Sequence, residues 1–171
     1  MHNRSLFPAL AFLILAAIIF TTQPSSAVTP DNRSSASGQG EFAFFNGSST
    51  EQWSYTFDVS ANKHGQARGR AIFDITGNST QTQVVVKVNC LNVFGSTGLA
   101  EALMTGTVLH SDDPDFAKGD NVIFTAVDNS GFPTPLADLI TPIFVFEGDC
   151  HEGASPLTLF QQSTDAIHVE R

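Results

Sequence analysis

The sequence predicts an all-β fold, an antiparallel meander of about eight strands forming an up-and-down β-barrel, with a two-sheet β-sandwich as the alternative. Apolar residues recur at every second position in short runs, which is typical of half-buried strands. Gly, Asn, Asp, Ser and Pro separate the runs, as tight turns require. No window predicts a convincing amphipathic helix, because the best one, PLADLITPIF, is interrupted by Pro142.

The N-terminal segment, residues 1–27, has the composition of a secretory signal peptide. Arg4 gives a positive start, residues 6–20 are apolar, and Ser25-Ser26-Ala27 is a small-residue cleavage site. The apolar run of about 15 residues is shorter than the roughly 20 that a transmembrane helix needs. We therefore expect cleavage after Ala27 and a secreted or periplasmic product with no stable membrane anchor.

Residues 28–40 are rich in Ser, Gly, Pro, Asn and Gln, which predicts a flexible tether, and a single β-domain is expected over residues 41–171. The chain has 8 basic and 17 acidic residues. Loss of Arg4 with the signal peptide leaves 7 basic residues and a net charge of −10. A protein this acidic is repelled by phosphate backbones, so we expect no nucleic-acid partner.

The expected strands are short segments bounded by turn residues: 41–45, 52–60, 67–76, 82–93, 99–110, 120–128, 142–147 and 165–170. Alternation assigns an inward face to four of them, which carries Trp53, Tyr55, Phe57 and Val59; Gly69, Ala71, Phe73 and Ile75; Val84, Val86, Val88 and Cys90; and Ala102, Met104, Gly106 and Val108. This mixture of small and large residues fits a filled small barrel or one with a modest cavity.

The two cysteines, Cys90 and Cys150, are predicted to form a disulfide, because an even number of cysteines in an exported chain indicates an oxidising compartment. The bridge would restrain a loop of roughly 60 residues and stabilise the fold by about 4 kcal/mol. The alternative is a metal site formed by Cys90, Cys150 and His151. Structural zinc, however, usually takes paired ligands such as C-x-x-C, which this sequence lacks.

A second candidate metal site lies in the segment SDDPDFAKGDN, which could bind calcium through Asp112, Asp113, Asp115 and Asp120. An EF-hand loop starting at Asp113 would have Lys118 in place of its glycine, so a solvated turn is the preferred interpretation. The sequence contains no G-x-S-x-G or comparable nucleophile motif. We assign no catalytic residue and expect no cofactor.

A candidate binding rim follows from the topology. In a meander, alternate turns lie at the same end of the barrel, so segment 129–141 should lie beside the turns at 95–98 and 62–66. The apolar side chains there would then frame one mouth of the barrel: Phe94, Phe132, Leu136 and Leu139. They would either bind a small apolar molecule or an extracellular protein, or plug the barrel end.

The order of motifs along the chain is GQGEFAFF, GQARGRAIFDI, VKVNCLNVFG, ALMTGTV, GDNVIFTAVDN and AIHVE. This order resembles a loose group of small secreted bacterial β-domains of unassigned activity, found alone or beside choice-of-anchor domains. The resemblance covers nearly all of residues 40–171, and the chain departs from it in a longer, more Pro-rich segment from Ser130 to Pro142. It implies a β fold and export, and no site residues.

Two classes of function fit these observations. One is a non-enzymatic secreted β-module that binds a small apolar ligand or a partner, or has a structural extracellular role. The other is a small barrel enzyme with an acid or base in its cavity, or a metal-binding module. A catalytic group has to be desolvated for its pKa to be tuned, and the inward positions hold almost no titratable residue. The sequence therefore favours the first class.

Overall fold

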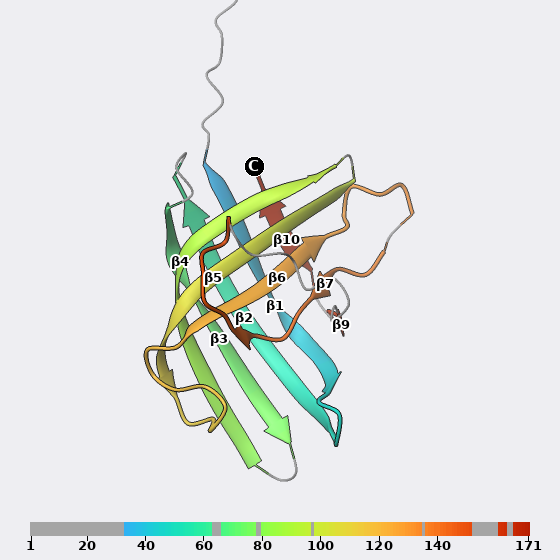
Figure 1. The fold of residues 1–171 in the computed structure, drawn as a ribbon. Coiled ribbons are helices and arrows are strands. Elements are labelled where there is room, and N and C mark those ends of the chain that lie inside the picture. The colour runs from blue at the N-terminus through green and yellow to red at the C-terminus, as the bar shows by residue number, and fades with distance from the viewer. Residues whose placement is uncertain are drawn as a thin grey trace, which may run out of the picture. The chain divides into compact units, whose positions relative to one another are not determined.

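The computed structural model describes residues 33–62, 66–77, 80–96, 98–134, 136–151, 161–163 and 166–171. These residues form one antiparallel sheet of ten strands, and none of them lies in a helix. The fold class predicted from the sequence, an all-β meander curled into a barrel-like sheet, is confirmed (Figure 1). The predicted signal peptide lies outside the described residues. Within them there is no helix long and apolar enough to cross a membrane.

Six long strands come first and pair in chain order: β1 (Ser34–Phe45), β2 (Thr50–Ala61), β3 (Gln66–Gly77), β4 (Thr80–Ser96), β5 (Leu99–Ser111) and β6 (Asn121–Asp128). Four short strands follow: β7 (Leu139–Ile140), β8 (Phe144–Val145), β9 (Gln161–Gln162) and β10 (Ile167–Glu170). Strands β7 and β8 both pair with β6, β9 pairs with β7, and β10 returns to pair with β1. Figure 1 shows that β5 and β6 cross in front of β1 and β2, as in a barrel wall.

Strand β1 begins at Ser34, whereas the sequence predicted a flexible tether as far as Gly40. Its small residues are required by packing. A Cβ atom on Gly38 would lie 2.9 Å from the ring of Phe57 and 3.1 Å from Ile167, so only glycine fits there. The low hydrophobicity of this stretch therefore reflects the close approach of its neighbours, and the domain extends further toward the N-terminus than predicted.

The inner face of the sheet holds the main core. Three of its rings, Phe57, Phe73 and Phe124, are at most 2% exposed. Phe124 meets Phe57 and Phe73 edge to face, with centroid distances of 6.0 and 5.2 Å. Burial of each ring stabilises the fold by about 2–3 kcal/mol. Because these rings come from opposite walls, side chains fill the interior at this level.

Cys90 differs from the sequence prediction, because it faces outward. Val88 pairs with Gly106 and Cys90 with Thr105, so Asn89 is an extra residue that forms a β-bulge. Beyond the bulge the alternation shifts by one, and Leu91 enters the inner core instead of Cys90. Cys90 joins a separate cluster on the outer face with Leu103, Ile123 and Cys150.

Two carboxylates satisfy the edge of β10 that does not pair with β1. Asp128 Oδ2 accepts the Val169 N–H (3.2 Å), and Asp138 Oδ2 accepts the Ile167 N–H (2.7 Å). The second oxygen of each carboxylate accepts a backbone N–H of the segment after β6, from Ser130 and from Asn129 respectively (both 2.8 Å). The two side chains thus take the place of a neighbouring strand, so the edge is not open to other chains.

The ionisation of Asp128 depends on these hydrogen bonds at the edge of β10. Burial raises the pKa of its carboxyl, but the hydrogen bonds from Ser130 and Val169 and the charge of His168 lower it by more in sum. The imidazole Nδ1 of His168 lies 3.7 Å from Asp128 Oδ2. The net result is a pKa below the ordinary value of 3.8.

This pKa shift gives a testable dependence of stability on pH. A carboxyl whose pKa is lower in the folded chain stabilises the fold fully above its unfolded pKa, about 3.9, and the stabilisation is lost as the pH falls through the folded value. We expect Asp128→Asn to lower the free energy of unfolding by about 1–3 kcal/mol at neutral pH. The deficit should shrink below about pH 4, as thermal unfolding at several pH values would measure.

The matched control is Asp115→Asn, which removes an exposed aspartate in the turn between β5 and β6. This control should unfold like the wild type at every pH. A deficit of Asp128→Asn that is the same at neutral and acid pH would contradict the role of the ionised carboxylate.

Candidate functional site

The predicted disulfide between Cys90 and Cys150 is confirmed, with the two Cα atoms 5.7 Å apart across 60 sequence positions. It fixes residues 144–151, which we call the strap, to the outer face of the sheet. The strap runs in front of β5 and β6 in Figure 1. The pairing of β8 with β6 also holds it, as do two hydrogen bonds: Phe146 N–H donates to the Asn121 carbonyl (2.9 Å) and Asn92 Nδ2 donates to the Cys150 carbonyl (3.2 Å).

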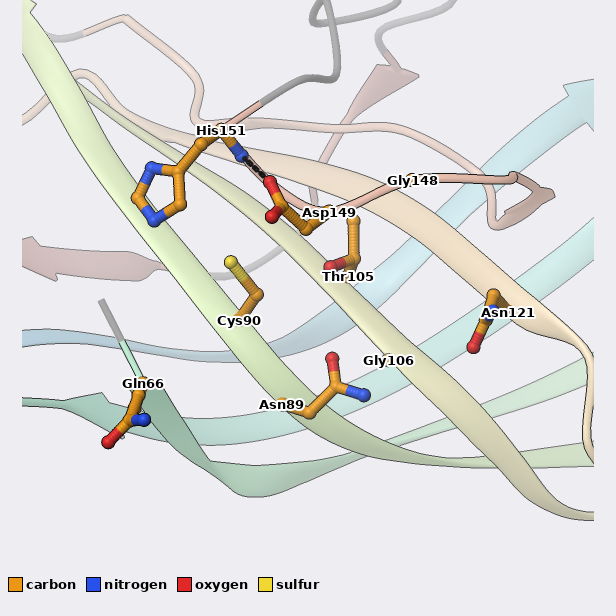
Figure 2. Close-up of a pocket in the computed structure, with 9 residues that line it drawn as sticks. All are labelled: Gln66, Asn89, Cys90, Thr105, Gly106, Asn121, Gly148, Asp149 and His151. Carbon is orange, nitrogen blue, oxygen red and sulfur yellow. Dashed lines mark hydrogen bonds between the residues drawn. The ribbon is translucent and has the colours of Figure 1, made fainter. Parts of the chain in front are cut away.

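The outer face is hollowed beside the strap into a depression of about 410 Å³, which we call the strap groove (Figure 2). Its walls come from four strands and the strap itself: Gln66 of β3, Asn89 and Cys90 of β4, Thr105 and Gly106 of β5, Asn121 of β6, and Gly148, Asp149 and His151. Most of these side chains are amides, hydroxyls or charged groups. Polar groups therefore contribute to the lining of the groove, whereas apolar side chains fill the interior of the barrel.

Two irregular pairings side by side create the groove. The bulge places both Asn89 and Cys90 on the outer face opposite Thr105. On the other side of β4, two residues of β3 separate Gln66 from Gly69, while one residue of β4 separates their partners. Gln66 and Asn89 both lie at these irregularities, so the groove lies where the regular pleat of the sheet is interrupted.

Glycine at position 106 forms part of the floor. A Cβ atom there would lie 2.4 Å from the Lys87 carbonyl oxygen and 2.7 Å from Cγ1 of Val86. Any other residue would therefore push β5 away from β4. The close approach of the two strands depends on this glycine, and the depression lies above it.

Hydrogen bonds orient the polar side chains around the groove. Thr107 Oγ1 accepts from Asn89 Nδ2 (3.5 Å) and donates to Asn121 Oδ1 (3.2 Å), so one hydroxyl links the amides of β4 and β6. On the strap, the carboxylate of Asp149 accepts the backbone N–H of His151 (2.7 Å; Figure 2). The groove thus presents donors and acceptors of hydrogen bonds from both walls.

The predicted metal alternative uses the same atoms as the disulfide. Cys90, Cys150 and His151 are the one group of potential ligands that converges among the described residues, with their ligand atoms within 4.8 Å of one another. Metal binding needs thiolates, and both sulfurs are joined in the disulfide. These three residues can therefore bind a metal only after reduction.

The aspartates of the predicted calcium site do not form such a group in the described part of the chain. Their carboxylates instead accept hydrogen bonds around the turn between β5 and β6. Asp113 accepts from Thr82 Oγ1 (2.6 Å), Asp120 accepts from the Ala117 N–H (2.8 Å), and Asp112 accepts from the Gln83 N–H. The exposed Asp115 contributes its own N–H to Asp113 (3.0 Å). This arrangement is that of a solvated turn.

The residues of the predicted rim lie in different environments. Phe94 packs against the outer cluster with Leu103 and Ile123, and not at a barrel mouth. Leu139 pairs with Val127 as part of β7, Phe132 is half-buried, and Leu136 is 55% exposed. The segment does lie beside the β4–β5 turn as expected, since a Cβ atom on Gly131 would lie 2.7 Å from Cα of Gly98.

Sequence reasoning did not identify Gln66, Asn89 and Asn121, because single amides in strands carry no signal of their own. The bulges bring them together. Comparisons of the chain with models of protein families, with curated proteins and with solved structures found no match.

Removal of the disulfide should loosen the strap and the groove together. We expect Cys90→Ala with Cys150→Ala to lower the free energy of unfolding by about 4 kcal/mol, because the unfolded chain loses a closed loop. The melting temperature should fall by on the order of 10 °C. Hydrogen exchange should show faster exchange at the Phe146 amide.

The reduced wild-type protein is the matched control, and its melting temperature should equal that of the double variant. Added zinc tests the metal alternative. Recovery of the melting temperature by one equivalent of zinc in the reduced wild type, but not in the double variant, would establish a metal site at Cys90, Cys150 and His151. Free thiols in the unreduced, unfolded wild type would contradict the disulfide.

Proposed function

We propose that this protein is an exported, non-enzymatic binding module that holds a hydroxyl-rich ligand in the strap groove. The observation that carries this proposal is that three side-chain amides, from Gln66, Asn89 and Asn121, line one hollow together with Thr105. Amides donate and accept hydrogen bonds at neighbouring atoms, and so do the hydroxyl groups of a saccharide. The set matches such a ligand without requiring any group to be ionised.

The properties of the groove support binding on the outer surface. Large rings fill the interior between β2, β3 and β6, so a small apolar ligand, as the sequence suggested, has no room at that level. The volume of about 410 Å³ lies within the range of ligand sites, roughly 300–1,000 Å³. The walls are held by the sheet and by the disulfide, so little conformational entropy is lost when a ligand binds.

Export is the second part of the proposal. The disulfide is typical of an oxidising, extracytoplasmic compartment, and the N-terminal sequence is that expected of a signal peptide. The net charge of −10 expected after cleavage favours solubility outside the cell. A rigid, soluble domain with a polar surface groove is suited to recognising saccharides in the surroundings of the cell.

Binding can be tested with an array of neutral oligosaccharides. The wild type should bind at least one, and Asn89→Ala with Asn121→Ala should weaken that binding by about tenfold or more, because two amide partners are lost. The control is Thr56→Ala, an exposed residue on the outer face of β2 away from the groove. It should bind like the wild type. Failure of the wild type to bind any oligosaccharide would contradict the proposal.

Processing can be tested by intact mass spectrometry of the protein recovered from the cell that makes it. The mass should correspond to a chain that starts at Val28 with both cysteines oxidised. The cell-free medium or periplasmic fraction should contain this species. Recovery of the full-length chain in the membrane fraction would contradict export with cleavage.

A further inference from the structure

A second hollow adjoins the strap groove on the same outer face. It has a volume of about 400 Å³ and lies where β1 and β3 begin and β2 ends, lined by Arg33, Ser60, Ala61, Asn62, Gln66 and Arg68. Gln66 lines both hollows. In Figure 2 it lies at the opposite end of the strap groove from Asn121. Because Gln66 lines both, we consider the two neighbouring hollows together and call them the extended groove.

The extended groove crosses the strands instead of following them. It passes from β1, through β2 and β3, to β4, β5 and β6 in the order in which these strands pair. Five spacings of about 4.8 Å between neighbouring strands give a length of roughly 24 Å along the sheet. This length suits a chain-like ligand with several units, whereas either hollow alone suits a single unit.

Positive charge is concentrated where β3 contributes to this surface. Of the seven basic residues in the mature chain, Arg33 and Arg68 line the second hollow, and Arg70 and Lys87 lie next to it on β3 and β4. Arg68, Arg70 and Lys87 are exposed, and none forms an ion pair with a described carboxylate. The rest of the protein is strongly acidic, so the charge of this cluster is opposite in sign to the net charge of the protein.

The register makes this cluster costly for folding. Arg70 lies directly opposite Lys87, and like charges in that position repel each other. Arg70 also lies opposite Asp58, but the two do not come within ion-pair distance. Among the described residues, no carboxylate forms an ion pair with Arg68, Arg70 or Lys87. An anionic ligand that bridges them would remove the repulsion.

We infer that the extended groove binds an acidic oligosaccharide, with its anionic groups at Arg68 and Arg70 and its hydroxyls at the amides of the strap groove. This inference rests on the proposed function for the hydroxyl contacts. A guanidinium binds a carboxylate or sulfate through two parallel hydrogen bonds, which gives orientation as well as attraction. The two arginines thus select a ligand that carries negative charge, and the amides of the strap groove add hydrogen bonds to its hydroxyls.

The composition of the groove favours a saccharide over other anionic chains. The described lining contains no Phe, Tyr or Trp on which nucleobases could stack. The groove also lies across paired strands and offers no free edge for strand addition.

The test compares a charged saccharide with its neutral methyl ester, and adds two other polyanions. The probes are a hexamer of galacturonate, its methyl ester, dextran sulfate and polyglutamate, measured by calorimetry at about 20 mM and about 300 mM salt. The hexamer should bind the wild type about tenfold or more tightly than its methyl ester at the lower salt concentration. The preference should shrink at the higher concentration, because exposed charges are screened.

The variants locate the charge contacts. Arg68→Ala with Arg70→Ala should abolish the preference for the charged hexamer, so that the hexamer and its methyl ester bind this variant with equal affinity. The control removes two positive charges elsewhere, by Lys118→Ala in the β5–β6 turn with Arg171→Ala at the C-terminus, and should keep the preference. Both variants should be compared with the wild type by melting temperature, to confirm that they are folded.

Each outcome separates this inference from the proposed function. Equal binding of the hexamer and its methyl ester would overturn the inference and leave the proposed function standing. Absence of binding to all saccharides would overturn both. Tighter binding of dextran sulfate than of the hexamer, with the same loss in the Arg68→Ala, Arg70→Ala variant, would assign the anionic group as sulfate. Polyglutamate binding as tight as the hexamer would overturn the saccharide in favour of an acidic peptide.

Discussion

The β-bulge at Asn89 decides which face of the sheet Cys90 occupies, and the outer surface of the protein depends on that choice. With strict alternation after Val88, Cys90 would enter the barrel, where it could not reach a partner on the strap. The extra residue turns it outward, so that the disulfide can fix the strap over Leu103 and Ile123. The second cluster depends on this bulge, and the groove depends on it together with the neighbouring irregularity between β3 and β4.

At β10 the barrel wall is completed by hydrogen bonds to side chains, which take the place of backbone pairing with another strand. Strand β10 pairs with β1, and its other edge donates to the carboxylates of Asp128 and Asp138. Hydrogen bonds to ionised acceptors are stronger than those between neutral groups, so a few of them can hold a short strand. This solution links the end of the chain to the segment after β6.

The two faces of the sheet have different physical roles. Aromatic and aliphatic side chains fill the inner face, so its contribution is to stability. The outer face of β3 to β6 carries amides, hydroxyls and unpaired cations, which folding does not require. The binding surface that we propose lies on the outer face, so changes in the groove need not disturb the core. The disulfide has both roles, because it stabilises the fold and forms a wall of the groove.

The sequence by itself determined the fold class, the inward faces of β2, β3 and β5, and the pairing of Cys90 with Cys150. Alternation with period two and an isolated pair of cysteines are local signals, and they do not depend on the neighbours of a strand. Only the tertiary structure decided the extent of β1, the face of Cys90 and the grouping of Gln66, Asn89 and Asn121. The glycine in β1 is explained by the ring of Phe57 on another strand, and the amides meet because bulges shift the register between strands. Such features depend on contacts between residues far apart in the chain, which hydrophobic alternation within one segment does not contain.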